Sequence, residues 1–317
     1  MRSLLRPFAL ILALLLLLTI GCSPLRSCLH ADEQKPVDAE KQALLDALIS
    51  ARPVTPGTAG PSLDVVVIDV GQGDSILLIS PEGNTMLVDA GPRDAFGSIQ
   101  KALYARGVSS IDVVVATHPH EDHIGSMADV LNAYPVGTYV TIPQTVQSGT
   151  NAAVNDALTK NGCSVVFAEG GTTIPWAESC TVTVLNPLPG YEADPDDLND
   201  QSVVLHVRYG DTAVLLAGDA EELAENRMLD TFPRSMLRAD VLKLGHHGSS
   251  SSTGFSFFLA VDPDFAVASC GADNDYGHPH RETLSLLYDT RTAFYSTDTD
   301  GTVTFHLDGE TVSVDLS

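Results

Sequence analysis

Four side chains that commonly bind metal ions lie within six residues of the chain. The segment 113–126 reads VVVATHPHEDHIGS and carries His118, His120, Asp122 and His123 directly after an apolar run. Imidazole and carboxylate groups suit zinc, manganese or iron. His118 and His120 are two residues apart and can share one ion, whereas Asp122 and His123 point apart and can serve a second. The spacing therefore predicts part of a site for two divalent ions, Zn²⁺ or Mn²⁺.

The remaining ligands are expected at strand ends farther along the chain. Asp219 ends the run TAVLLAGD, where one carboxylate can contact two cations and offset their repulsion. A helix N-cap is its alternative role, since AEELAE follows. His246 and His247 follow the run VLKL. One of them is expected to complete the second ion, and we favour His246, which leaves His247 to contact substrate or to support a ligand.

Two histidines in the later loop DYGHPH are assigned to the reaction itself. His278 and His280 would bind a substrate oxygen or protonate a leaving group beside the ions, and Asp122 is the third residue assigned a catalytic role. Two exposed loop histidines are the alternative interpretation of this motif.

Further carboxylates are expected to support the ligands. The motif DVGQGDS has two glycines that permit a tight turn between strands, so that its carboxylates can hydrogen-bond a metal ligand. A purely structural turn explains the motif nearly as well, and the same two interpretations apply to LVDAG. The residues assigned to this supporting group are Asp69, Asp74 and Asp89.

Strand and helix patterns alternate from Leu63 onward and must position these residues. Short apolar runs such as 111–117 (IDVVVAT) indicate strands buried on both faces, and amphipathic runs such as 96–107 (FGSIQKALYARG) indicate helices. Residues 202–208 and 212–217 are expected to form a hairpin around YGD. The alternation predicts an α/β fold in which helices cover the sheets, within one domain of residues 63–317.

The first 62 residues have a different composition. Two arginines precede an apolar run of residues 8–18, followed by TIGC, which is the pattern of a signal peptide over residues 1–21. The cysteine resembles that of a bacterial lipobox, which implies a lipid on Cys22, export, and anchoring to the outer face of the cytoplasmic membrane. An uncleaved membrane span is the alternative, but the apolar run is short for one. Residues 22–62 are then expected to be a flexible tether with a short helix at 39–51.

Charge and cysteine content narrow the possible functions. Seventeen basic and 41 acidic residues give a formal net charge of -24. This charge repels phosphate backbones, which argues against an extended nucleic-acid-binding face, so a polyanionic substrate would be met locally at the metal site. Cys163 and Cys180 each belong to a β-rich run, and a disulfide between them is plausible in an exported protein, although two buried free thiols fit almost as well. The sequence identifies no protein partner.

Six sequence blocks together resemble the metallo-β-lactamase-fold hydrolases over residues 63–317. They are DVGQGDS (69–75), LVDAG (87–91), THPHEDHIG (117–125), LLAGD (215–219), LKLGHHGSSSS (242–252) and YGHPH (276–280). The narrower resemblance is to the extracellular nuclease-like domain of ComEC-type competence proteins and their free-standing relatives. It implies a four-layer αββα sandwich of two mixed sheets, with the metal site at one edge between the sheets.

The chain departs from this family pattern at one ligand position. Many members place a third histidine for the first ion between HxHxDH and the bridging aspartate, whereas this chain has DDLNDQSVVLHV there, with His206 inside a strand. Asn199 and Ser202 lie in the loop instead, and both are added to the residues expected to support the ligands or to contact substrate. An asparagine and a serine at this place fit the ComEC-type resemblance and imply a more weakly held first ion.

These observations together predict an extracytoplasmic metal-dependent hydrolase of phosphodiester bonds. A nuclease acting on DNA follows from the resemblance, whereas the acidic composition fits a small phosphodiester or a phosphorylated wall polymer better. One alternative is a hydrolase of a carbon-centred bond, of the lactone or β-lactam type, and the absent third histidine counts against it. The other is a non-catalytic metal-binding surface lipoprotein, and the intact HPHEDH motif counts against that.

Overall fold

The computed structural model describes residues 39–53, 60–143, 146–190 and 197–317. The predicted signal peptide and the lipid attachment residue Cys22 lie outside these residues. Asp38 to Ser317 form one compact unit.

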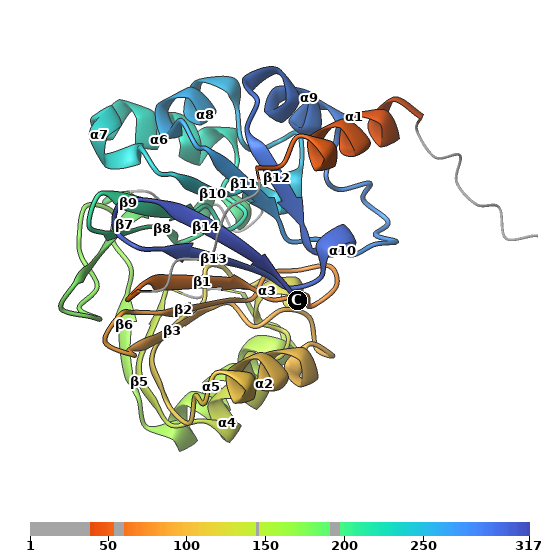
Figure 1. The fold of residues 1–317 in the computed structure, drawn as a ribbon. Coiled ribbons are helices and arrows are strands. Elements are labelled where there is room, and N and C mark those ends of the chain that lie inside the picture. The colour runs from red at the N-terminus through yellow and green to blue at the C-terminus, as the bar shows by residue number, and fades with distance from the viewer. Residues whose placement is uncertain (1–38, 54–59, 144–145, 191–196) are drawn as a thin grey trace, which may run out of the picture. The chain divides into compact units, whose positions relative to one another are not determined.

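Two mixed β-sheets stack face to face in the centre of this unit (Figure 1). The first sheet has the order β14-β13-β1-β2-β3-β4-β5-β6, and the second has the order β12-β11-β10-β9-β8-β7. The strands of the first sheet are β1 (Leu63–Val67), β2 (Ile76–Ile79), β3 (Thr85–Val88), β4 (Ile111–Val115), β5 (Val136–Thr141), β6 (Ser164–Phe167), β13 (Val303–Leu307) and β14 (Val312–Leu316). Those of the second are β7 (Cys180–Asn186), β8 (Val204–Tyr209), β9 (Thr212–Leu216), β10 (Val241–Lys243), β11 (Phe265–Ala268) and β12 (Ala293–Ser296).

Helices cover the outer face of each sheet (Figure 1). The first sheet is covered by α2 (Phe96–Ala105), α4 (Met127–Ala133) and α5 (Gly149–Asn161). The second is covered by α1 (Ala39–Ser50), α6 (Glu222–Thr231), α7 (Arg234–Leu237), α8 (Phe255–Val261) and α9 (Arg281–Thr290). Short helical turns, α3 (Glu121–Ile124), α10 (Thr297–Asp300), η1 (Asn199–Gln201) and η2 (Gly245–Gly248), lie in the connections. The predicted four-layer αββα sandwich is thus confirmed.

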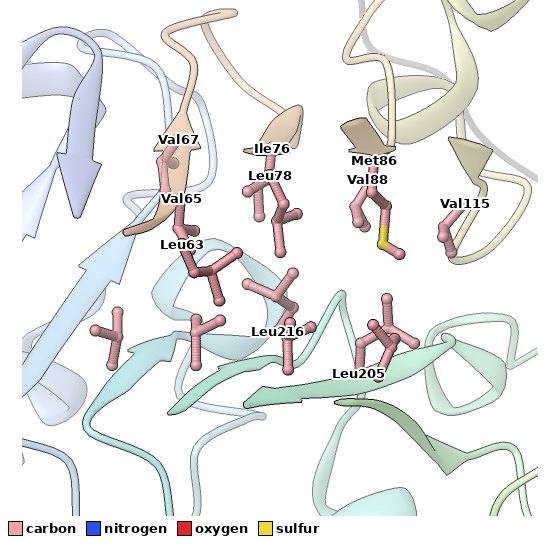
Figure 2. Packing of buried hydrophobic residues seen from close by; sticks show 14 of the residues in the cluster. Leu63, Val65, Val67, Ile76, Leu78, Met86, Val88, Val115, Leu205 and Leu216 are labelled. Atoms are coloured by element: carbon pink, nitrogen blue, oxygen red, sulfur yellow. The ribbon is translucent and has the colours of Figure 1, made fainter. Parts of the chain in front are cut away.

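Three apolar layers hold the four structural layers together. Side chains alternate along each strand, so Val65 and Val67 of β1 point to the layer between the sheets, whereas Val66 points to the layer under the helices. Figure 2 shows the first of these layers, where β1 to β4 face Leu205 and Leu216 of the second sheet. Burial on both faces explains why the strands read as continuous apolar runs.

The helix predicted on the tether packs against the body of the protein. Leu45 and Leu48 of α1 are buried in the same apolar layer as Leu284 and Leu287 of α9. After the helix, the guanidinium of Arg52 makes two hydrogen bonds with the carboxylate of Asp300, at 2.7 and 2.6 Å. Because these contacts bury apolar surface and pair a half-buried charge, α1 is part of the compact unit rather than a helix on a flexible segment.

The expected disulfide is not formed in the structure. Cys163 and Cys180 are free thiols. Cys163 precedes β6 and packs against the layer under the first sheet, whereas Cys180 begins β7 and lies in the layer between the sheets. Belonging to β-rich runs does not bring the two cysteines together, because β6 and β7 are edge strands of different sheets.

Candidate metal centre

The chemically important loops meet at one edge of the sandwich because they follow parallel strands. β4 leads into HPHEDH, β9 into Asp219 and β10 into the two adjacent histidines, while the loop with His278 follows β11. β4 runs parallel to β3 and β5 in the first sheet, and β9, β10 and β11 run parallel to one another in the second, so within each sheet their carboxyl ends lie at the same edge. Segments more than 100 residues apart in the sequence therefore contribute to one site.

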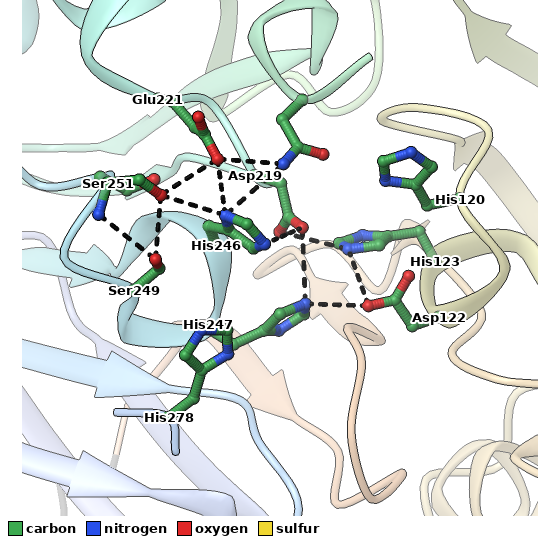
Figure 3. Close-up of polar contacts among 12 residues, drawn as sticks. His120, Asp122, His123, Asp219, Glu221, His246, His247, Ser249, Ser251 and His278 are labelled. Carbon is green, nitrogen blue, oxygen red and sulfur yellow. Dashed lines mark hydrogen bonds and ion pairs between the residues drawn. The ribbon is translucent and has the colours of Figure 1, made fainter. Parts of the chain in front are cut away.

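Two residues from each sheet form the centre of the site. Asp122, His123, Asp219 and His247 each place one ligand atom within 4.8 Å of the others. Nε2 of His123 lies 3.2 Å from Oδ1 of Asp219, and Nε2 of His247 lies 3.1 Å from Oδ2 of Asp122 and 3.5 Å from Oδ2 of Asp219 (Figure 3). The mixed nitrogen and oxygen donors suit a borderline divalent cation.

Two buried atoms at this centre have no hydrogen bond among the described residues. They are Nε2 of His123 and Oδ1 of Asp219, whose separation meets an ion-pair distance but not hydrogen-bond geometry. Both residues are essentially inaccessible to solvent. Buried polar atoms without partners are costly, and a cation between these donors would satisfy both. The residues present therefore fit a bound metal ion.

The first predicted ligand pair lies beside the same aspartate. His118 is fully buried, and its Nε2 atom is 3.9 Å from Oδ2 of Asp219 and 2.9 Å from Nδ1 of the half-buried His120. The rings of His118 and His123 have centroids 4.2 Å apart. His118, His120 and Asp219 can therefore contribute to a second ion position next to the four-residue cluster, with Asp219 shared between the two.

The histidines of this first loop are oriented by polar neighbours. Nδ1 of His123 contacts Oδ2 of Asp89 at 2.8 Å, and the same carboxylate accepts hydrogen bonds from the backbone N–H and the hydroxyl of Thr117. Oγ of Ser202 lies 3.3 Å from Nδ1 of His118 and accepts a hydrogen bond from the N–H of Asp219. Asp89 and Ser202 thus fix the side of each ring that faces away from the site.

Electrostatics at the centre follow from the buried carboxylates. Burial alone would raise the pKa of Asp219, but the charges of His123 and His247 outweigh it and hold that pKa well below the ordinary value. Burial would likewise lower the pKa of His123, but Asp219 and Asp89 raise it well above the ordinary value. The site therefore retains ionised carboxylates and attracts positive charge.

The geometry favours His247 over His246 as the ligand from the second loop. Nδ1 of His247 donates to the carbonyl oxygen of Ser269 at 2.8 Å, which directs its Nε2 atom to Asp122 and Asp219. Nε2 of His246 is farther from Asp219, at 3.8 Å from Oδ2. The sequence-based preference for His246 could not use this difference, since neighbouring residues in a loop have no fixed direction.

His246 is part of a second hydrogen-bonded group beside these residues (Figure 3). Its Nδ1 atom donates to Oε1 of Glu221 at 2.8 Å, and the same oxygen accepts from the hydroxyl of Ser251 and the side-chain amide of Asn199. Oδ1 of Asn199 is buried without a hydrogen bond among the described residues. Sequence reasoning missed Glu221, which looked like one of several acidic residues at the start of a helix.

The two histidines of the DYGHPH loop make different contacts, although their ring centroids are 4.8 Å apart. His278 faces the site, with its ring centroid 5.4 Å from that of His246 and 6.0 Å from that of His247. His280 uses both ring nitrogens on backbone atoms, since Nδ1 accepts from the N–H of Ser250 and Nε2 contacts the carbonyl oxygen of Tyr276. These hydrogen bonds join two loops, and the catalytic role expected for His280 stays a prediction.

The two aspartates of DVGQGDS also differ. Asp69 is exposed and accepts a hydrogen bond from the N–H of Gly71, so it stabilises its own turn and the structure does not bring it to the metal centre. Asp74 is buried, and its Oδ2 atom lies 2.8 Å from Nζ of Lys243, which is also fully buried. Lys243 was missed, although a lysine inside the apolar run VLKL is an unusual signal. The remaining histidine considered, His206, donates to the carbonyl oxygen of Arg238 away from the site.

Within the residues that the structure describes, none of the helices is both long and apolar enough to cross a membrane.

The sequence matches a family model and is similar to competence proteins of the ComEC type. The model of the metallo-beta-lactamase superfamily matches residues 68–189. ComE operon protein 3 of Bacillus subtilis is 31% identical over 260 residues, which cover 76% of this chain and 33% of that protein. Recombination protein 2 of Haemophilus influenzae is 29% identical over 248 residues, covering 77% of this chain and 29% of that protein. The chain thus matches about a third of the length of these relatives.

A solved structure supports the same fold at low sequence identity. A mutant of CmlA beta-hydroxylase superposes with a TM-score of 0.52 and 14% identity, covering 80% of this chain and 55% of that one. Together with the two mixed sheets and the ligand cluster at their edge, these matches show that the chain belongs to the metallo-β-lactamase superfamily, with sequence relatives among ComEC-type competence proteins.

Proposed function

We propose that this protein is a metal-dependent hydrolase of phosphodiester bonds that acts outside the cytoplasm. The observation that supports it most is the convergence of Asp122, His123, Asp219 and His247 at one edge of the sandwich, with a second histidine pair beside them. One relative is named for recombination, which makes DNA the first substrate to test.

The chain can hold two divalent ions about the shared carboxylate of Asp219. His118 and His120 would hold one, and Asp122, His123 and His247 the other. Bound ions of this kind supply Lewis acids for a phosphate oxygen and lower the pKa of bound water. Asp89 and Ser202 hold the ligand rings in orientation. Misoriented ligands would lower the affinity for the metal on which the reaction depends.

His278 is placed to contact the substrate. Burial and the neighbouring histidines lower its pKa to about 3, so its imidazole is neutral at physiological pH. A neutral imidazole both donates and accepts a hydrogen bond, which suits contact with a phosphate oxygen or a leaving oxygen. His246, oriented by Glu221, lies beside His278, with ring centroids 5.4 Å apart, and is the second candidate for moving a proton.

The acidic composition bears on the size of the substrate. With a net charge of -24, the protein repels a long phosphate backbone except where bound cations reverse the local field. A short or small phosphodiester therefore fits better than a long duplex held along the surface. Export and a lipid on Cys22 remain part of the proposal on the strength of the N-terminal sequence alone. A Cys22→Ser variant should shift the protein from the membrane fraction to the soluble fraction.

Three substrates distinguish the proposed function from its alternatives. The metal-loaded protein, with Mn²⁺ or Zn²⁺, is assayed on bis-p-nitrophenyl phosphate, plasmid DNA and nitrocefin. We expect hydrolysis of the first, and of DNA if the substrate class extends to nucleic acid, with activity lost in Asp122→Ala and kept in the control Asp69→Asn. Hydrolysis of nitrocefin alone would favour a carbon-centred substrate. A filled metal site without hydrolysis of any of the three would overturn the proposal.

A further inference from the structure

A buried ion pair lies directly behind the metal centre and joins the two sheets. Lys243, at the end of β10, is 0% exposed, and Asp74, in the loop between β1 and β2, is 1% exposed. Nζ of Lys243 is 2.8 Å from Oδ2 of Asp74 and also donates to the carbonyl oxygen of Leu244 at 2.8 Å. Two fully buried charges carry a large desolvation cost, and replacing such pairs with apolar residues often leaves stability unchanged. Stability alone is therefore a weak reason for this pair.

Asp74 contacts both halves of the metal site. Its Oδ1 atom lies 3.4 Å from Nδ1 of His247 and has no hydrogen bond among the described residues. Its backbone N–H donates to the carbonyl oxygen of Asp122 at 3.1 Å. The approach is close enough that a β-carbon on Gly73 would overlap that same carbonyl oxygen. Asp74 thus touches the ring of one ligand and the backbone of another, which come from different sheets.

The second loop needs such support because its backbone is strained. His246 and His247 have φ values of 45° and 56°, in the left-handed region that residues with a β-carbon seldom adopt. Lys243 holds the start of this loop through the carbonyl oxygen of Leu244, and Asp74 lies against the ring of His247. The ion pair can therefore fix both the loop and the ring.

We propose that Lys243 is a positioning residue for the metal centre, acting through Asp74 to place His247 and Asp122 around one ion. This inference rests on the proposed function for its relevance to hydrolysis, but it concerns metal binding and can be tested without any substrate. It predicts that the ion held by Asp122, His123, Asp219 and His247 depends on the pair more than the ion beside His118 does.

The test uses the full chain and three variants, Lys243→Met, Asp74→Asn and the double variant. Unfolding by urea in EDTA reports stability, and titration with Co²⁺ followed by visible absorption reports the number and affinity of bound ions. Lys243→Met should lose stability, since it leaves Asp74 buried without its partner, and the double variant should recover much of that loss. The double variant should nevertheless bind one of two Co²⁺ ions about 10–100-fold more weakly, the usual loss when a residue behind a ligand is removed.

A matched pair elsewhere in the fold provides the control. Arg52 and Asp300 form a nearly buried ion pair, with side-chain exposures of 13% and 7%. Arg52 follows α1 and Asp300 ends α10, so neither belongs to the loops that carry the ligands. The variant Arg52→Met/Asp300→Asn should change stability and leave both Co²⁺ affinities as they are.

The outcomes separate this inference from the proposed function. If the Lys243→Met/Asp74→Asn protein binds two Co²⁺ ions as tightly as the unchanged protein, the positioning role is overturned. If the unchanged protein binds two ions but hydrolyses no phosphodiester, the proposed function fails, while the Co²⁺ titrations still decide the role of Lys243.

Discussion

Two histidine-containing loops meet at the metal centre, and they are built in different ways. The first loop, after β4, leads into the short helix α3, and His120 at its N-cap has an ordinary extended backbone with φ of -71°. The second loop, after β10, places His246 and His247 in the left-handed region. The first loop thus has an ordinary backbone conformation, whereas the second holds two non-glycine residues in a strained one.

The supporting contacts reflect this difference. In the first loop, His123 is oriented by Asp89, which directly follows the neighbouring parallel strand β3, and His118 contacts Ser202. In the second loop, His247 depends on the carbonyl oxygen of Ser269 and on Asp74, which comes from the other sheet. We therefore expect substitutions away from the ligands to disturb the second loop more than the first.

The largest effect is expected from Asp219, which contacts histidines of both loops. Asp219→Ala removes the carboxylate that lies within 3.9 Å of His118, His123 and His247. Since a bound metal contributes several kcal/mol to a hydrolytic barrier, kcat/KM should fall roughly 10³-fold, with loss of bound metal measured by mass spectrometry. Asp211→Ala, in the hairpin turn before the same strand, serves as the control. Unchanged metal content in Asp219→Ala would contradict the assignment of a shared ligand.

The next largest effect tests the choice between the adjacent histidines of the second loop. His247→Ala should lower kcat/KM about 100-fold and release one of two ions, because it removes the imidazole nearest Asp122. His246→Ala should retain both ions and lose no more than about tenfold in kcat/KM. The opposite pattern of metal contents would restore the sequence-based preference for His246.

A pH effect should arise from the residue that holds the end of the second loop. Glu225 accepts hydrogen bonds from the N–H groups of Thr253 and Gly254, and burial raises its pKa from 4.5 to about 7. The protonated form is favoured in the folded state, so its stabilising contribution is complete below pH 4.5 and is lost as the pH rises through about 7. Across this window we expect a loss of about 3 kcal/mol relative to Glu225→Gln.

Urea unfolding in EDTA, at a series of pH values, measures this difference without interference from metal binding. Parallel curves for the unchanged protein and Glu225→Gln would show that Glu225 does not titrate in this range.

The smallest effect is a change in the free energy of unfolding at two glycine positions. Gly248 ends the helical turn η2 of the second loop with φ of +86°, and a β-carbon there would lie 2.7 Å from Cβ of Pro279. Gly248→Ala should therefore destabilise the protein by about 2 kcal/mol. Gly97, exposed in α2 with open space around it, is the matched control, and Gly97→Ala should stabilise by about 0.5–1 kcal/mol. Equal effects in urea unfolding would remove the argument that the second loop is strained.

The fold could be predicted from the sequence because its signals are local. Apolar runs at 63–67 and 111–115 became buried strands of the first sheet, and the hairpin around YGD became β8 and β9. The pattern did not reveal α5, whose polar face and neutral composition give weak helical periodicity. The packing of α1 was also out of reach, since it depends on an apolar surface formed by α9 more than 200 residues later.

In the candidate site, too, the residues signalled by local sequence were predicted and those that depend on tertiary contacts were not. The grouping of His118, His120, Asp122 and His123 follows from their spacing, and Asp219 from its place at a strand end. The roles of His247, His280 and Asp69 could not be read, because they depend on backbone direction and on which carbonyl group each side chain meets. The role of Lys243 could not be predicted, because its ion-pair partner Asp74 comes from the other sheet.

The packing of α1 also determines where a fragment of this chain must begin in order to fold as a stable unit. Without α1, Leu284 and Leu287 of α9 would no longer pack near Leu45 and Leu48, and an apolar patch would be exposed to solvent. A fusion protein or recombinant fragment that starts at β1 should therefore aggregate. A fragment that starts before Ala39 keeps this apolar surface buried.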